Sequence, residues 1–269
     1  MTHASSPAPR QHSRLIRFLS DLAVADIEAT HRDFADRLGQ LLDFGDSIVL
    51  ADALKQRRTW VAAPDTTPAA TVRAEFLSMQ ERLVSTVVNS CTPGLDSPRV
   101  RWPALARNEA RTDTPPAGFE PYRRFYVALQ RDLDASIRNL RTTVRDAMSG
   151  LSEQLSQLAA LDIALEDTLW DHTRAFFAVI PAFLEKRFEH LFGGESSVFP
   201  PNGLEQFRRE CQGLLLAELE VRLQPALGLL EALEASEKVE AFAEVEASEE
   251  LHAESPAIDT LNQKETHSS

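Results

Sequence analysis

The sequence predicts an all-α protein built from long helices. Leu, Ala, Glu and Arg dominate the chain, whereas only 10 of its 269 residues are glycine, and good helix formers lose little rotamer freedom when a helix forms. Apolar residues recur at steps of three and four, the period of one helix face. Prolines and glycines gather in short segments that separate these stretches. We therefore expect an N-terminal helical unit, long coiled-coil-like helices or a helical hairpin, and a disordered acidic C-terminal tail.

The first part of the chain predicts a compact N-terminal helical unit over residues 13–60, after a polar, disordered start at residues 1–12. Thr30 and Asp33 are spaced like a capping box, and Asp46 can cap a further short helix. Apolar residues at helical spacing mark three successive short helices: Leu15, Ile16, Leu19 and Leu22, then Phe34, Leu38, Leu41 and Leu42, then Ile48, Leu50 and Leu54.

Two proline-containing linkers, at residues 61–70 and 91–121, flank a predicted amphipathic helix at residues 71–90. Six prolines rule out a long helix in the second linker, because each lacks an amide donor and restrains the residue before it. One apolar face defines the helix: Val72, Phe76, Met79, Leu83 and Val87. Three apolar residues of the second linker could anchor it to the body: Val100, Trp102 and Leu105.

Residues 122–233 predict a long helical bundle or coiled-coil region. The apolar positions of its first part are separated by threes and fours throughout: Tyr126, Leu129, Leu133, Ile137, Leu140, Val144, Met148, Leu151, Leu155 and Leu158. Their 11-residue repeat suits one very long, nearly straight helix or a hairpin of two helices. A second series predicts a last helix from 204 to 233: Leu204, Phe207, Cys211, Leu215, Leu219, Leu223, Leu227 and Leu230.

Helix breakers divide this region. Gly150 is the expected bend if the first stretch is a hairpin, and Pro181 and Pro225 are expected kinks, since a proline inside a helix removes one hydrogen bond. Gly193 and Gly194 are expected to end the long stretch.

Charge is unevenly distributed along the chain. Ten acidic and two basic residues in the tail, residues 234–269, account for −8 of the formal net charge of −13, which leaves −5 for the remainder. The body can therefore present basic surfaces despite the acidic composition. The tail has too little apolar content to fold alone, and we expect it to be disordered.

Composition also indicates a compartment. The only cysteines, Cys91 and Cys211, lie far apart in the sequence and lack further ligands at zinc spacing, so neither a disulfide framework nor a zinc site is indicated. The first residues lack the apolar core of a signal peptide, and no apolar stretch reaches the length of a membrane span. We expect a cytoplasmic protein.

The segment Phe44-Gly45-Asp46-Ser47-Ile48 resembles the first block of GDS-type lipases and esterases, in which the serine is the nucleophile. Those hydrolases place the serine after a β-strand and supply a later Asp-x-x-His pair, because the serine needs a base and the base needs an orienting carboxylate. No aspartate lies three residues before any histidine here, and the motif follows a helical pattern. A helix start at Asp46 is the favoured interpretation, and a hydrolase using Ser47 stays as an alternative.

Other catalytic and metal patterns are weaker. Glu28-x-x-His31 and Glu249-x-x-His252 have the spacing of di-iron bundle ligands, but one lies at a helix boundary and the other in the tail. Asp171 and His172 are neighbours that point about 100° apart on a helix. We therefore expect no catalytic site, no cofactor and no metal.

Arginines recur along residues 122–149 and form a candidate interaction surface, which we name the arginine ridge: Arg124, Arg131, Arg138, Arg141 and Arg145. Such a ridge could bind an acidic partner, the acidic tail or a phosphate backbone. Interleaved Asp132, Asp134 and Asp146 favour a solvated face with local ion pairs. A nucleic-acid-associated regulator is therefore a less favoured alternative to a protein-binding one.

The opening of the chain carries a resemblance, on Ser13-Arg14-Leu15 to Leu19, His31, Phe34-Ala35, Arg37-Leu38-Gly39 and Asp43 to Asp46 before Leu50. It resembles a domain-of-unknown-function family of proteobacterial proteins of similar length. The family is similar to ones encoded beside MotA/TolQ-like and OmpA-like envelope proteins, which would imply an accessory of an envelope complex.

The apolar seam of the long helices needs a partner to cover it, either another segment of the chain or another copy. We expect a non-enzymatic helical interaction or scaffold protein whose partner is itself or an envelope-associated protein.

Overall fold

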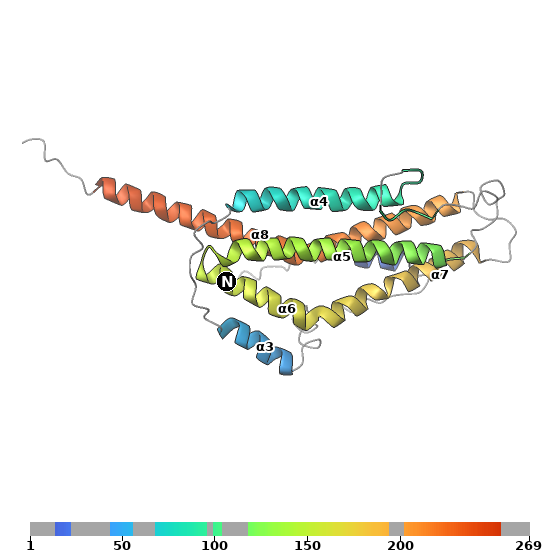
Figure 1. Cartoon of the computed structure of the whole chain (residues 1–269), viewed down its shortest axis with the longest axis horizontal. Coiled ribbons are helices and arrows are strands. Elements are labelled where there is room, and N and C mark those ends of the chain that lie inside the picture. Colours follow the sequence, from blue (N-terminus) through green and yellow to red (C-terminus); the bar gives the residue numbers. More distant parts are fainter. Residues whose placement is uncertain are drawn as a thin grey trace, which may run out of the picture.

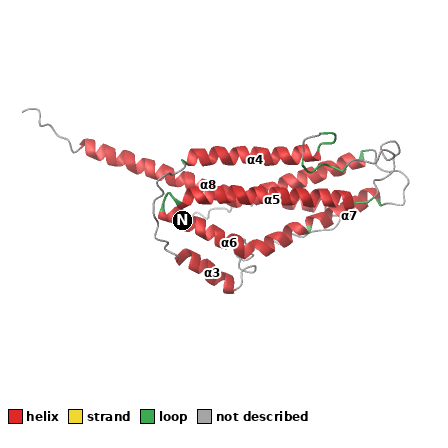
Figure 2. Ribbon diagram, viewed as in Figure 1, coloured by secondary structure: helices red, strands yellow, loops and turns green. Residues whose placement is uncertain are grey.

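The computed structural model describes residues 14–22, 44–55, 68–95, 99–103, 118–193 and 202–253. The regular elements of these residues are all helices, as Figure 2 shows. The predicted all-α class is confirmed. The helices are α1 (Arg14–Leu22), α3 (Phe44–Lys55), α4 (Ala69–Cys91), α5 (Glu120–Ser149), α6 (Glu153–Ala178), α7 (Ile180–Phe192) and α8 (Gly203–Ala253).

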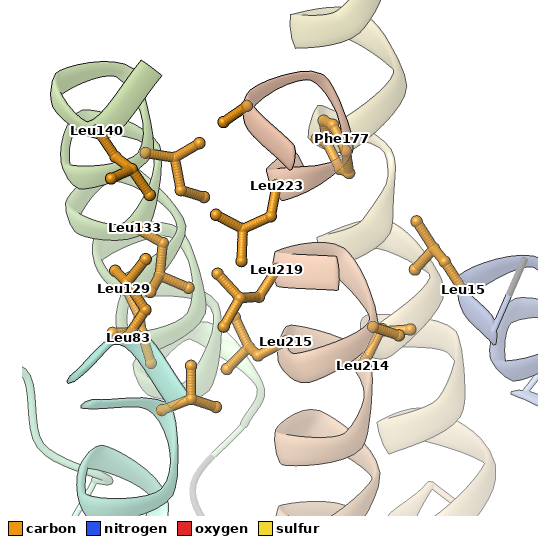
Figure 3. Packing of buried hydrophobic residues seen from close by; sticks show 14 of the residues in the cluster. Leu15, Leu83, Leu129, Leu133, Leu140, Phe177, Leu214, Leu215, Leu219 and Leu223 are labelled. Carbon is orange, nitrogen blue, oxygen red and sulfur yellow. The ribbon is translucent and has the colours of Figure 1, made fainter. Parts of the chain in front are cut away.

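Helix α8 is the axis of an elongated bundle and contacts α1, α4, α5, α6 and α7. Its predicted apolar series is buried or half-buried along its length. In Figure 3, Leu215 and Leu219 point toward Leu129 of α5, whereas Leu214 points toward Leu15 of α1 on the opposite side. The apolar seam of the long helices is thus covered by other helices of the same chain.

Helices α5 and α6 form a hairpin, which decides between the two predicted arrangements. Helix α5 ends at Ser149, and the amide of Leu151 donates to the carbonyl of Met148 across the Gly150 turn at 3.2 Å. The hydroxyl of Ser152 then accepts from the amide of Leu155, which caps the start of α6. The predicted seam remains on the inside of the hairpin, with Leu129, Val144 and Met148 fully buried.

A proline divides α6 from α7. Helix α6 ends at Ala178, and α7 begins at Ile180 with Pro181 in its first turn, where a missing amide is tolerated. The break lies near the predicted kink, and Figure 1 shows the two helices meeting at an angle. Gly193 follows the end of α7, as predicted. Pro225, in contrast, lies exposed within a continuous α8.

Helix α4 rests on α8 and α5, and its ends match the predicted helix to within two residues. After it, the chain turns at Gly94, whose φ of 79° suits a residue without a side chain. The amide of Trp102 donates to the carbonyl of Ser90 at 2.9 Å. Trp102 is buried and Val100 packs partly against the core, so both predicted anchors are confirmed, whereas Leu105 lies outside the described residues.

The two described helices of segment 13–60 pack on different parts of the body. Helix α1 lies on α8 and α7, where a Cβ at Gly213 would come within 2.8 Å of the Phe18 ring, so this close approach depends on the glycine. Helix α3 lies against α6 instead. The predicted compact unit over residues 13–60 also includes residues 23–43 and 56–60, which lie outside the described residues, so its internal packing stays a prediction. The predicted helix around Phe34 lies outside the described residues.

Helix α8 continues into the acidic segment that was predicted to be disordered from residue 234. It is helical to Ala253 and, in Figure 1, projects past the first residue of α4. A carboxylate oxygen of Glu237 accepts from the amide of Ala69, and Glu234 pairs with Arg73 at 2.9 Å. The helix runs past the predicted end at residue 233, because a helix that is already nucleated can extend through Ala- and Glu-rich sequence without a core. Residues 254–269 lie outside the described part.

Replacing Trp102 should test whether the second linker is fastened to the body as the contacts indicate. Its ring lies 5.1 Å from those of Tyr122 and Phe125, between centroids, in a cluster that includes Phe207. We expect Trp102→Ala to lower the free energy of unfolding by about 3–5 kcal/mol, measured by urea titration. Leu95→Ala, at an exposed position of the same linker, should cost no more than about 0.5 kcal/mol. A similar small loss for both variants would contradict the anchoring.

Candidate functional site

The most unusual chemical group of the bundle is a buried carboxylate on α8. Glu218 is 1% exposed, whereas acidic side chains are almost never fully buried unless they are paired. The side-chain amide of Gln130 on α5 donates to both of its oxygens, at 2.8 and 3.0 Å. The hydroxyl of Tyr126, one turn earlier on α5, donates to Oε1 as well. Two residues of α5 are therefore held in register with one residue of α8.

Arg222 supplies the positive charge beside this carboxylate. Its guanidinium lies 3.4 Å from Oε2 of Glu218 and 3.0 Å from a carboxylate oxygen of Asp134 on α5. It also lies over the ring of Phe177, 3.7 Å from the ring centroid, a cation–π contact. The charge on Glu218 is thus balanced within the bundle by a group that joins α5, α6 and α8.

The same cluster repairs the break at Pro181. In an uninterrupted helix the amide of residue 181 would donate to the carbonyl of Phe177, but proline has no amide hydrogen. The backbone amide of Val179 turns back to that carbonyl, and the side chain of Gln130 also donates to it, at 3.3 Å. Gln130 therefore links the freed backbone group of α6 to Glu218 of α8. We refer to Tyr126, Gln130, Glu218 and Arg222 as the polar centre.

Burial controls the proton chemistry of the polar centre. Desolvation raises the pKa of Glu218 above its ordinary value, and the donors Tyr126, Gln130 and Arg222 oppose this by stabilising the carboxylate. Burial, together with the neighbouring Glu218 carboxylate, also raises the pKa of Tyr126. The donors to Glu218 are side chains of α5 and of α8 itself, so we interpret the polar centre as a contact that aligns these two helices.

A second charged cluster clamps the α5–α6 hairpin. Nε of Arg141 and Nε of Arg145 each lie 2.7 Å from a carboxylate oxygen of Asp162 on α6. Arg145 also pairs with Glu166, one turn further along α6. The side chains of both arginines are at least six-sevenths buried, at 14% and 11% exposed. Charge-assisted contacts of this geometry are among the stronger hydrogen bonds in proteins.

The arginine ridge is therefore not one surface. Arg141 and Arg145 face α6 and are used inside the bundle, because the hairpin brings Asp162 and Glu166 beside them. The other three are exposed, and Arg124 pairs with Glu120 at 3.0 Å. Arg138 pairs with Asp134 and lies over the ring of Trp170. Of the interleaved acidic residues, Asp134 forms such a local ion pair, and Arg131 is exposed on the same helix.

The candidate nucleophile Ser47 lies exposed within α3, a helix that begins at Phe44 and includes the whole motif. The hydrolases that the motif resembles require a strand-to-helix turn at this point, and here the backbone is helical throughout. Asp46 lies in the first turn of α3 and does not precede it. The predicted cap position is therefore shifted by the earlier helix start.

The other candidate chemical groups are not brought together. His172 is exposed on α6, and Glu28 and His31 lie outside the described residues. Within the described part, no group of three or more His, Cys, Asp or Glu side chains could hold a metal ion. Cys91 and Cys211 are buried free thiols, and burial raises the pKa of Cys91 to about 12. None of the described helices combines the length and apolar character needed to cross a membrane.

A family model described as a protein of unknown function (DUF3348) matches residues 1–235. The chain belongs to this family. Neither a curated protein nor a solved structure matches it. The range matched by the DUF3348 model ends just after Leu233, the last side chain described as buried on α8. The family match thus includes the polar centre and the hairpin clamp, and it ends two residues before Glu237, which contacts the first amide of α4.

Arg145→Ala should be far more damaging than Arg131→Ala. Removing Arg145 leaves Arg141 as the one arginine that balances the carboxylates of Asp162 and Glu166 in the clamp. Breaking a buried ion pair costs roughly 3 kcal/mol. Arg131 is exposed on the same helix, so its removal should change the free energy of unfolding by no more than about 0.5 kcal/mol. Urea denaturation of both variants tests this. Equal losses would show that the clamp is not a stabilising contact.

Glu218 should give the protein a pH-dependent stability of defined sign. Its pKa is raised in the folded state, so between the ordinary value of 4.5 and the raised value the folded state holds more protons than the unfolded state. This part of the stability is complete below pH 4.5 and is lost as the pH rises through the folded pKa. The variant Glu218→Gln has no titrating carboxyl at this position and therefore lacks this pH-dependent contribution. We expect the unfolding free energy of the native protein, minus that of Glu218→Gln, to fall as the pH rises above 4.5.

Urea titrations of both proteins at several pH values measure this difference directly, and contributions of other titrating groups largely cancel in it. A difference that rises with pH would mean that the donors outweigh burial at Glu218.

Proposed function

We propose that this protein is a non-enzymatic, cytoplasmic helical interaction protein, in which the bundle holds the acidic end of α8 available to a partner protein. The observation that carries the proposal is the projection of α8 beyond the bundle. Glu234 and Glu237 tie its base to α4, through Arg73 and the amide of Ala69. Beyond them, Val239 is 68% exposed and Val245 is 54% exposed.

Exposed valines on a lone helix favour binding. Single exposed apolar residues are common on protein surfaces, but an isolated helical segment gains most of its stability from packing an apolar face against something else. Helix-in-groove recognition uses such a segment, with apolar anchors spaced along one helix. Val239 and Val245 are six residues apart and point about 120° away from each other, so a partner would contact two sides of the projecting helix, whose base is fixed to α4 by two contacts.

The charge of the segment indicates the chemistry of its partner. Residues 239–253 include five glutamates and neither lysine nor arginine. A groove with basic residues on its rim would complement this charge, and such complementarity accelerates association and selects among partners. For the same reason a nucleic acid is a poor partner for this end of the molecule.

An envelope-associated protein is the partner class that the family resemblance favours. Proteins encoded beside MotA/TolQ-like and OmpA-like neighbours are candidates for accessories of an envelope complex, and a cytoplasmic bundle could attach to the cytoplasmic part of such a complex. Self-association through the same segment is the second outcome to distinguish.

Two substitutions on the projecting helix should abolish partner binding while leaving the bundle folded. We expect tagged native protein, purified from cell extract that includes solubilised membranes, to recover a partner at stoichiometric level. Val239→Glu with Val245→Glu should reduce this recovery at least tenfold, because buried carboxylates at the anchor positions would need desolvation.

The matched control is Ser78→Glu with Ser85→Glu, which adds the same charge at exposed positions of α4. It should recover the partner normally, and light scattering should establish the oligomeric state of all three proteins. Equal recovery by both double variants would overturn the proposed role of α8. Recovery of the bait alone, as a monomer, would overturn the interaction function.

A further inference from the structure

A groove between α4 and α5 contains polar groups that the fold does not use. It has a volume of about 540 Å³, within the range of small-molecule sites. The second half of α4 and the first half of α5 form its walls, and Val100 of the anchored linker contributes to one end. The apolar part of its lining consists of core residues that include Leu83, Leu129 and Leu133.

Ser90 is the buried polar group of this groove without a partner. Its residue is 1% exposed, and its hydroxyl makes no hydrogen bond within the described part of the chain. The nearby hydroxyls of Thr86 and Thr92 on α4 donate to the carbonyls of Arg82 and Val88. Ser90 does not make this contact, although a buried unsatisfied hydroxyl is costly and rare. A ligand atom in the groove would satisfy it.

Two arginines give the groove a positive charge. Arg82 and Arg99 both line it, and both are exposed. Neither guanidinium has an ion-pair or hydrogen-bond partner among the described residues, in contrast to the paired arginines of the polar centre and the hairpin clamp. The one carboxylate of the lining is Asp132. Two positive groups and one negative group leave a single excess positive charge.

From these features we propose that the groove binds a small amphiphile with a monoanionic head, namely a medium-chain carboxylate. The guanidinium groups of Arg82 and Arg99 would hold the carboxylate, a geometry that suits arginine. The hydroxyl of Ser90 would donate to one of its oxygens, and the alkyl chain would lie along the half-buried Val100, above the floor that the buried Leu83, Leu129 and Leu133 form. A phosphate dianion fits less well, because Asp132 leaves only one positive charge in excess.

Octanoate, an eight-carbon carboxylate, is the probe that tests this site. We expect isothermal titration calorimetry of the full chain to show saturable binding at one site per chain, weakened by added salt. Arg82→Ala with Arg99→Ala should weaken octanoate binding at least tenfold. Arg131→Ala, an exposed arginine of α5 outside the groove, should leave it unchanged. The uncharged analogue 1-octanol should bind at least tenfold more weakly than octanoate.

Ser90→Ala separates ligand binding from a purely structural role. Removing an unsatisfied buried hydroxyl should raise the melting temperature of the free protein, while octanoate binding weakens several-fold because one donor is lost. A lower melting temperature together with unchanged binding would mean that Ser90 serves only packing.

Three other results would overturn the proposal: no saturable octanoate binding, octanoate binding unaffected by loss of both arginines, or equal binding of 1-octanol. Stronger binding of inorganic phosphate than of octanoate, abolished by the double arginine variant, would contradict the carboxylate and identify a phosphate site in its place.

Discussion

The carboxylate of Glu218 constrains how the helices of this bundle can be aligned. A charge that is taken out of water must keep its hydrogen bonds, and removing one partner of such a group is strongly destabilising. Tyr126 and Gln130 reach Glu218 only at one register of α5 against α8. Sliding α8 by one turn would retain much of the apolar contact, because leucines recur at that spacing. It would, however, leave the Glu218 carboxylate buried without its hydrogen-bond donors on α5. Leucine packing supplies the attraction, and the polar centre selects one alignment.

The break at Pro181 depends on the same group. A proline within a helix leaves a carbonyl without its amide, and in a bundle interior that carbonyl needs another donor. Gln130 meets this need at Phe177 while it is held by Glu218. Helix α6 can therefore end inside the bundle, and α7 can leave at a different angle toward α1 and α8. The same Gln130 side chain therefore contacts both the break between α6 and α7 and the carboxylate that aligns α5 with α8.

The apolar periodicity was sufficient to predict the class, the long helical stretches and nearly all of the seam, because helix faces are encoded locally. The Pro181 break was predictable because proline lacks an amide donor, whereas the sequence left open whether Gly150 is a turn or lies within one long helix. Arg141 and Arg145 were assigned to a surface because their partners lie on α6, and only the hairpin register reveals them. Glu218 gave a signal that was missed: it lies between Leu214, Leu215 and Leu219, on the face that predicts core. Its partners Tyr126 and Gln130, far away in sequence, could not be predicted.

Helix α4 connects the two surfaces that we propose to bind other molecules. Its first amide is capped by Glu237, at the base of the projecting helix, and Ser90 lies at its other end beside the groove. This capping replaces the side-chain cap that α4 lacks at Pro68 and places a negative charge at a helix N-terminus, where the helix dipole favours it. The acidic segment thus begins by completing α4 before it leaves the bundle.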